Sequence, residues 1–118
     1  MEKFSVTLPL TGEYLTTVRL TTGGLCALVG FDVDAAEDFK VCVTESLLIL
    51  KRNGYTTAQI DFTIAEALGC SIIGVEQGGE SENSFEDEIS HALLAALLGN
   101  VDIEKTQNGQ VKRISFEG

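Results

Sequence analysis

The stretch DVDAAEDFKVCVTESLLILKRNGY, residues 32–55, predicts a long amphipathic helix. Asp32 or Asp34 can cap this helix, because a carboxylate at the N-cap accepts hydrogen bonds from the free amides of the first turn. Basic side chains come last, up to Arg52, where they suit the negative end of the helix dipole. An Asn-Gly pair then ends the helix. One acid, Glu45, lies in a run that is otherwise uncharged until Lys51.

Residue patterns predict the other elements. Alternating apolar and polar residues indicate strands, and apolar residues at helical spacing indicate helices. In chain order we expect a strand within residues 4–10, a helix at 13–29 that ends at Gly30, and the helix described above. Two strands near 58–65 and 70–76, joined by a turn at 67–69, and a polar loop at 76–84 follow. The chain then forms a helix at 85–98, with Ser84 as its N-cap, and two strands around Asn108-Gly109. The Asn-Gly pair in the last segment is the strongest short-range hairpin signal.

The predicted order is therefore β-α-α-β-β-α-β-β within a single domain, residues 1–118. Strands that pair through hairpins, with helices gathered on one face, form a two-layer α/β sandwich. We expect a mixed, mostly antiparallel sheet with three helices on the same side. A chain of this length can bury one hydrophobic core without disulfides or metals.

Charge and cysteine content narrow the classes of function. A net charge of −10 argues against nucleic-acid binding, which needs clusters of basic residues. The longest apolar run, residues 92–98, is too short to cross a membrane, so we expect a cytoplasmic protein. Cys26, Cys42 and Cys70 lack paired spacing and lie among apolar residues. Because the chain has one histidine, they predict buried reduced thiols rather than a zinc site.

The chain resembles a known family over nearly its whole length, most densely in its first half. VRLTTGGLCALVGFDVDAAEDFKVCVTES, residues 18–46, and RNGY, residues 52–55, are similar to the first two helices of the anti-sigma-factor serine kinases. These kinases are a branch of the GHKL (Bergerat-fold) ATPase superfamily. The resemblance implies that fold, the binding of ATP and Mg²⁺, phosphorylation of a serine on a small antagonist protein, and binding of a sigma factor, usually as a homodimer.

Three motifs carry the family's nucleotide chemistry, and the first is incomplete here. The family has a glutamate that acts as general base and, four residues later, an asparagine that coordinates Mg²⁺. Glu45 matches the glutamate, but Ile49 occupies the asparagine position. Isoleucine offers no oxygen to a cation that requires oxygen ligands. The resemblance therefore implies no metal site and leaves Glu45 as a remnant base.

The second and third motifs also depart from the family's pattern. An Asp-x-Gly motif that holds adenine is Glu76-Gln77-Gly78 here, so Glu76 and Gly78 would contact ATP only if the site is retained. The glycine-rich phosphate segment corresponds to residues 88–91, which contain no glycine. Residues 76–88 are acidic instead, and no lysine or arginine occurs from 53 to 104. Like charges this close disfavour a bound triphosphate.

Three features of the sequence each have a functional and a structural interpretation. His91 could act in catalysis, but the sequence shows no residue to orient it, so we expect a partly exposed position on the last helix instead. Arg19 matches an arginine that the resemblance assigns to partner binding, and it is otherwise a solvated helix charge. The acidic segment 76–88 is either a docking surface for a basic partner or a lid remnant.

These observations predict a degenerate anti-sigma-factor-type domain that binds a protein and in which ATP and Mg²⁺ binding and kinase activity are lost or weakened. The expected partner is a sigma factor or an antagonist-like protein, and a homodimer is one expected arrangement. No cofactor is expected, with ATP and Mg²⁺ as the cofactors if the site is retained. The alternative is an active ATP-dependent protein serine kinase that phosphorylates a small antagonist protein.

Overall fold

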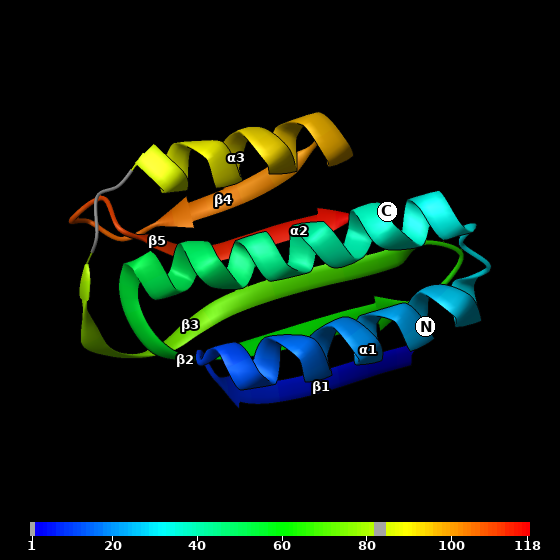
Figure 1. Ribbon diagram of the computed structural model, residues 1–118, viewed down its shortest axis with the longest axis horizontal. Helices are drawn as coiled ribbons and strands as arrows, with labels where there is room; N and C mark the ends of the chain where they lie inside the picture. Colours follow the sequence, from blue (N-terminus) through cyan, green and yellow to red (C-terminus); the bar gives the residue numbers. More distant parts are fainter. Residues whose placement is uncertain (1, 82–84) are drawn as a thin grey trace.

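The structure is a computed structural model that describes residues 2–81 and 85–118. Within these residues the chain forms five strands and three helices, and Figure 1 shows the helices on one face of the sheet. The elements are β1 (Glu2–Pro9), α1 (Gly12–Val29), α2 (Val33–Arg52), β2 (Asn53–Ile64), β3 (Leu68–Ser81), α3 (Phe85–Leu98), β4 (Val101–Lys105) and β5 (Val111–Glu117). The predicted element order and the two-layer α/β sandwich are confirmed.

The sheet has the strand order β1-β2-β3-β5-β4. Each pair of neighbours is antiparallel, so the described sheet is wholly antiparallel and not mixed as expected. β2 and β3 form one hairpin, and β4 and β5 form a second. The turn of the second hairpin contains Gly109 at φ 82°, a left-handed conformation that glycine adopts easily. The Asn-Gly signal therefore predicted this hairpin correctly.

The two long helices begin and end close to where the sequence predicted. The Asp32 carboxylate accepts a 2.8 Å hydrogen bond from the Ala35 amide, so Asp32 and not Asp34 caps α2. α1 ends at Gly30, which has φ 83° and donates its amide to the Ala27 carbonyl at 3.2 Å. This left-handed glycine turns the chain directly from α1 into α2.

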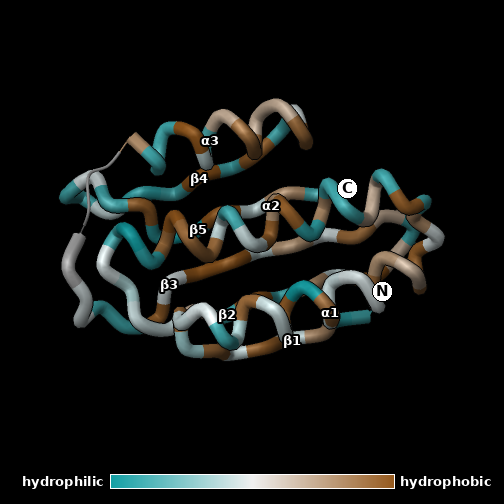
Figure 2. The backbone as a smooth tube through the Cα atoms, viewed as in Figure 1, coloured by the Kyte–Doolittle hydropathy of each residue, from teal (hydrophilic) through white to brown (hydrophobic). Residues whose placement is uncertain are grey.

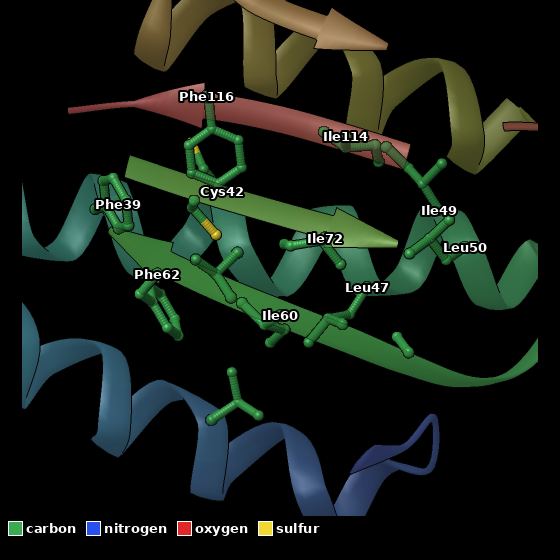
Figure 3. Packing of buried hydrophobic residues seen from close by; sticks show 14 of the residues in the cluster. Phe39, Cys42, Leu47, Ile49, Leu50, Ile60, Phe62, Ile72, Ile114 and Phe116 are labelled. Atoms are coloured by element: carbon green, nitrogen blue, oxygen red, sulfur yellow. The ribbon is translucent and has the colours of Figure 1, made fainter. Parts of the chain in front are cut away.

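α2 supplies the centre of the hydrophobic core. Figure 2 shows hydrophobic and hydrophilic residues alternating along this helix, as its amphipathic sequence predicts. Its buried side chains pack against the inward faces of β2, β3 and β5 (Figure 3). The largest fully buried side chains include Phe39, Leu47, Ile49 and Leu50 of α2, Ile60 and Phe62 of β2, Leu68 and Ile72 of β3, Leu94 of α3, and Ile114 of β5.

Strand boundaries differ from the sequence prediction in three places. β2 begins at Asn53 rather than near residue 58. Residues 76–81 belong to β3 and are not a loop, because β3 continues to pair with β2, with Glu76 opposite Thr57. The hairpin turn lies at 65–67 rather than 67–69, because Leu68 already pairs with Ile64. The expected N-cap of α3, Ser84, lies outside the described residues. Glycine suggested a turn at 67–69 and, together with polar residues, a loop at 76–84, but cross-strand pairing determined the structure.

The prediction of buried, unpaired thiols is confirmed for Cys26, Cys42 and Cys70. Burial raises the pKa of all three, because a thiolate loses hydration inside the protein, and it raises the pKa of Cys42 to about 12. The nearby carboxylates of Asp38 and Glu45 add to the effect on Cys42. None of the helices formed by the described residues has the length and apolar character needed to cross a membrane.

Candidate functional site

Five polar side chains meet between α2 and α3, which lies beside α2 in Figure 1. Glu45 and Arg52 come from α2, and Asp87, Ser90 and His91 come from α3. Residues two helical turns apart, or at i, i+3 and i+4, lie on the same side of a helix. The two residues of α2 therefore face α3, and the three residues of α3 face α2. We call these five residues the α2–α3 polar cluster.

Ser90 occupies the centre of this cluster. Its hydroxyl donates a hydrogen bond to Glu45 Oε2 at 2.7 Å and accepts one from Arg52 Nη1 at 2.9 Å. Arg52 Nη1 also lies 3.4 Å from the Glu86 carbonyl oxygen and 3.5 Å from Asp87 Oδ1. Ser90 is only 2% exposed, so both of its hydrogen bonds form away from bulk water. Removing either partner would leave the buried Ser90 hydroxyl with one of its two hydrogen bonds.

Asp87 connects Arg52 to His91. The Nε2 atom of His91 lies 3.3 Å from Asp87 Oδ2, and the two side chains are 31% and 22% exposed. The partial exposure of His91 agrees with the structural interpretation, whereas its partner Asp87 was missed in the sequence. No described hydrogen bond joins His91 to the Ser90 hydroxyl, so these residues do not form a Ser-His-Asp arrangement.

Ile49 lies in a buried apolar environment, whereas Glu45 lies in the α2–α3 polar cluster. It is 0% exposed, and Figure 3 shows it pointing toward Ile114 of β5. Its carbonyl accepts a 2.8 Å hydrogen bond from Asn53 Nδ2. The position at which the resemblance expects a Mg²⁺ ligand therefore offers buried hydrocarbon, which does not fit this cation. Among the described residues, no three His, Cys, Asp or Glu side chains are grouped as metal ligands.

Glu76 and Gly78 lie exposed on the last part of β3. The Glu76 carbonyl accepts a 3.4 Å hydrogen bond from Thr56 Oγ1. A Cβ atom at Gly78 would lie 3.6 Å from Thr56 Cγ2, an ordinary contact distance, so close packing does not require glycine there. No described hydrogen bond or ion pair joins either residue to Glu45. The structure therefore does not bring the residues of the first two motifs into direct contact.

The segment that corresponds to the third motif, residues 88–91, lies inside α3 and not in a loop before a helix. A pocket of about 620 Å³ opens at the end of α2, and Arg52 forms part of its lining. None of the four residues that match the first two motifs lines this pocket. Residues other than the matched motif positions thus line this pocket.

Arg19 lies on the exposed side of α1 beside a second pocket, of about 450 Å³. The lining also contains Lys40 of α2 and Leu20, whose side chain is 74% exposed. Gly23 lies at the point where α1 approaches the Lys40 side chain, since a Cβ there would meet Lys40 Cδ at 3.6 Å. Two cations and an exposed apolar side chain thus lie together on a protein of net charge −10.

Sequence reasoning missed Ser90 as the hydrogen-bond partner of Glu45 and Asp87 as the partner of Arg52. A signal was present, because polar residues recur at helical spacing on one side of each helix. That spacing shows which residues share a side of one helix. It does not show which two helices pack together, and this pairing places Ser90 against Glu45.

Comparison with known proteins adds a likeness over part of the chain. Over 67 residues, which are 57% of this chain, it is 30% identical to the serine-protein kinase RsbW of Bacillus mycoides (strain KBAB4). Part of this chain is similar to RsbW. Over 54 residues, which are 46% of this chain, it is 32% identical to the RsbW of Bacillus thuringiensis (strain Al Hakam). The aligned regions span 42% and 34% of these two RsbW proteins.

The chain thus matches less than half the length of these relatives. No protein-family model matches the chain. The likeness to RsbW supports the resemblance to anti-sigma-factor serine kinases that the sequence motifs indicated.

Proposed function

We propose that this chain is a regulatory protein-binding domain of the anti-sigma-factor type, in which ATP and Mg²⁺ binding and kinase activity are lost or weakened. One observation carries the proposal. The Glu45 carboxylate, which matches the family's general base, is held by the Ser90 hydroxyl of α3 at 2.7 Å. A general base must reach the proton that it removes, so a carboxylate already bonded to a helix side chain is poorly placed for this role.

The metal position supports the same proposal. Phosphoryl transfer depends on Mg²⁺ to neutralise charge on the transferred group. Ile49 takes the place of the expected ligand and belongs to the hydrophobic core. The first turn of α3 adds Glu86, Asp87 and Glu88, which would face a triphosphate with like charges.

Calorimetric titration with Mg²⁺-ATP tests the loss of nucleotide binding. We expect a dissociation constant weaker than about 100 μM, equivalent to about 5.5 kcal/mol of binding free energy. The RsbW of Bacillus mycoides, measured under the same conditions, is the positive control. Tighter binding by this chain would exclude the proposed loss of the site.

The second candidate function is an active ATP-dependent protein serine kinase. It is favoured by the likeness to proteins named serine-protein kinases and by the retained Glu45. Transfer of labelled phosphate from ATP to a small antagonist-like protein separates the two candidates. Transfer that Glu45→Gln abolishes would establish the kinase, whereas no transfer by the unaltered chain, beside an active RsbW control, supports the binding domain.

Protein binding is proposed to use the surface around Arg19. A two-hybrid matrix can pair this chain with the sigma factors and antagonist-like proteins of its own genome. Arg19→Glu should abolish the interaction, because it reverses the charge beside Leu20 and Lys40. Lys3→Glu reverses a charge on β1, away from the Arg19 surface, and serves as the matched control. This variant should leave the interaction intact. Equal capture by both variants would remove Arg19 from the interface.

A homodimer belongs to the same proposal. Sedimentation equilibrium should then give twice the 12.6 kDa mass of one chain. The mass of a single chain throughout the micromolar range would argue for a monomer that meets its partner directly.

A further inference from the structure

The pocket at the end of α2 has an apolar wall. Leu10, Leu48 and Tyr55 line it, and they come from the segment after β1, from α2 and from β2. Tyr55 is 6% exposed, and its ring lies directly against Gly74 of β3. A ring held from behind in this way forms a rigid surface. The volume of about 620 Å³ is within the range of small-molecule sites.

A positive group lies at the rim of this wall. Lys51 lines the pocket, is exposed and forms no ion pair among the described residues. The second cation of the lining, Arg52, is already bonded to Ser90 and paired with Asp87. Lys51 is therefore the group that remains available to an incoming anion.

Two hydroxyl groups and one acid complete the polar side of the lining. Thr11 and Thr56 line the pocket, and among the described residues their hydroxyls make only long hydrogen bonds of 3.4 Å, to Glu13 and to the Glu76 carbonyl. Glu86 also lines the pocket and is exposed. Its carboxylate, together with the negative end of the α2 dipole, disfavours a ligand with several negative charges.

We propose that this pocket binds a small amphipathic monoanion, with an apolar or aromatic body against Leu48 and Tyr55 and one anionic group at Lys51. This site is separate from the residues that match the nucleotide motifs, because none of them lines it. A bound ligand would also contact Arg52, which holds α3 to α2 through Ser90. The inference does not depend on whether nucleotide binding is lost.

A matched pair of probes tests the proposal on the full chain. 1-Anilinonaphthalene-8-sulfonate carries one sulfonate, and N-phenyl-1-naphthylamine has the same aromatic body without charge. Fluorescence titration gives both affinities, and amide chemical shifts of the ¹⁵N-labelled protein locate the bound probe. We expect the sulfonate to bind about tenfold or more tightly than the neutral probe, with the largest shifts at Thr11, Leu48, Lys51, Tyr55 and Thr56.

Lys51→Met keeps the aliphatic stem and removes the charge, so it should weaken sulfonate binding about tenfold while the neutral probe binds as before. Lys3→Met, at the far end of β1 from the pocket, is the control and should change neither affinity. The amide spectrum of each variant verifies that it is folded.

Three results would overturn the proposal. They are equal affinity for the two probes, equal effects of Lys51→Met and Lys3→Met, and largest shifts at the exposed apolar residues of α1, Leu20 and Leu28. Displacement of the sulfonate by Mg²⁺-ATP would make the pocket part of a nucleotide site and overturn its separate assignment. Failure of both probes to bind would likewise overturn the pocket proposal, but it leaves the proposed regulatory function standing, since that function rests on Glu45.

Discussion

The Ser90 hydroxyl of α3 donates a 2.7 Å hydrogen bond to the Glu45 carboxylate of α2, across 45 positions of sequence. The same hydroxyl accepts a 2.9 Å hydrogen bond from Arg52. The negative and positive side chains of α2 are thereby bridged by one buried group on α3. Through this contact Glu45, which the sequence analysis left as a remnant base, helps to attach α3 to α2.

Replacement of the central hydroxyl should destabilise the protein. Ser90→Ala leaves Glu45 and Arg52 without their shared partner in a part-buried site, and we expect the free energy of unfolding to fall by about 1–3 kcal/mol. Urea denaturation, followed by circular dichroism, measures the change. Ser5→Ala is the matched control, because Ser5 donates a 2.6 Å hydrogen bond to the Asp61 carboxylate at an exposed site.

The control should cost less than about 1 kcal/mol, since water replaces a lost partner at an exposed site. A double-mutant cycle with Glu45→Gln then isolates the pairwise free energy between Ser90 and Glu45. Equal losses for Ser90→Ala and Ser5→Ala would contradict the structural role of the α2–α3 polar cluster.

Restoring the family's asparagine should not restore a metal site. Ile49→Asn places an amide among buried apolar side chains, and we expect a loss of about 3–5 kcal/mol of stability with no gain in Mg²⁺-ATP binding. Ile49→Val, which removes one methylene group, should cost about 0.5–1.5 kcal/mol. Unfolding measurements and calorimetry report the two effects. A folded Ile49→Asn variant that binds Mg²⁺-ATP would show that the site is recoverable.

Gly74 of β3 should not tolerate a side chain. A Cβ at this position would overlap the Tyr55 ring, so Gly74→Ala must displace a buried aromatic residue. We expect a loss of about 1–3 kcal/mol. Gly24→Ala is the opposite case, because its Cβ would meet nothing within 4 Å and it lies in α1. Alanine there should stabilise the helix by about 0.5–1 kcal/mol. Thermal unfolding of both variants tests the contrast.

Stability should fall at alkaline pH partly because of Cys42. Burial raises the pKa of this thiol from the ordinary 9.0 to about 12. Above pH 9 the unfolded chain therefore loses a proton that the folded chain retains. The contribution of the Cys42 thiol to the free energy of unfolding is fully present below pH 9 and is lost as the pH rises toward 12.

The loss can approach about 1.4 kcal/mol per pH unit for one thiol. Cys42→Ala should make the decline shallower, whatever constant loss it causes by removing a buried sulfur. Urea unfolding from pH 7 to pH 11 of both proteins gives the two slopes. Parallel slopes would show that Cys42 ionises alike in the folded and unfolded chains.

Local sequence determined the elements and their order. The helix end at Gly30 and the hairpin at Gly109 each depend on residues within a few positions of one another, so the pattern predicted them directly. For the same reason it narrowed the cap of α2 to Asp32 or Asp34, and the structure selects Asp32. Hydrophobic periodicity likewise predicted which side of α2 is buried, and this follows from the geometry of a single helix.

Only the tertiary structure decided what Glu45 contacts. The packing of α3 on α2, which brings Ser90 and Arg52 together, depends on how the whole sheet positions both helices. The extension of β3 to Ser81 also depended on a contact between two elements, because pairing with β2 outweighed a local glycine-rich pattern. Sequence patterns report the neighbours of a residue within one element, whereas contacts between distant elements depend on the free energy of the complete fold.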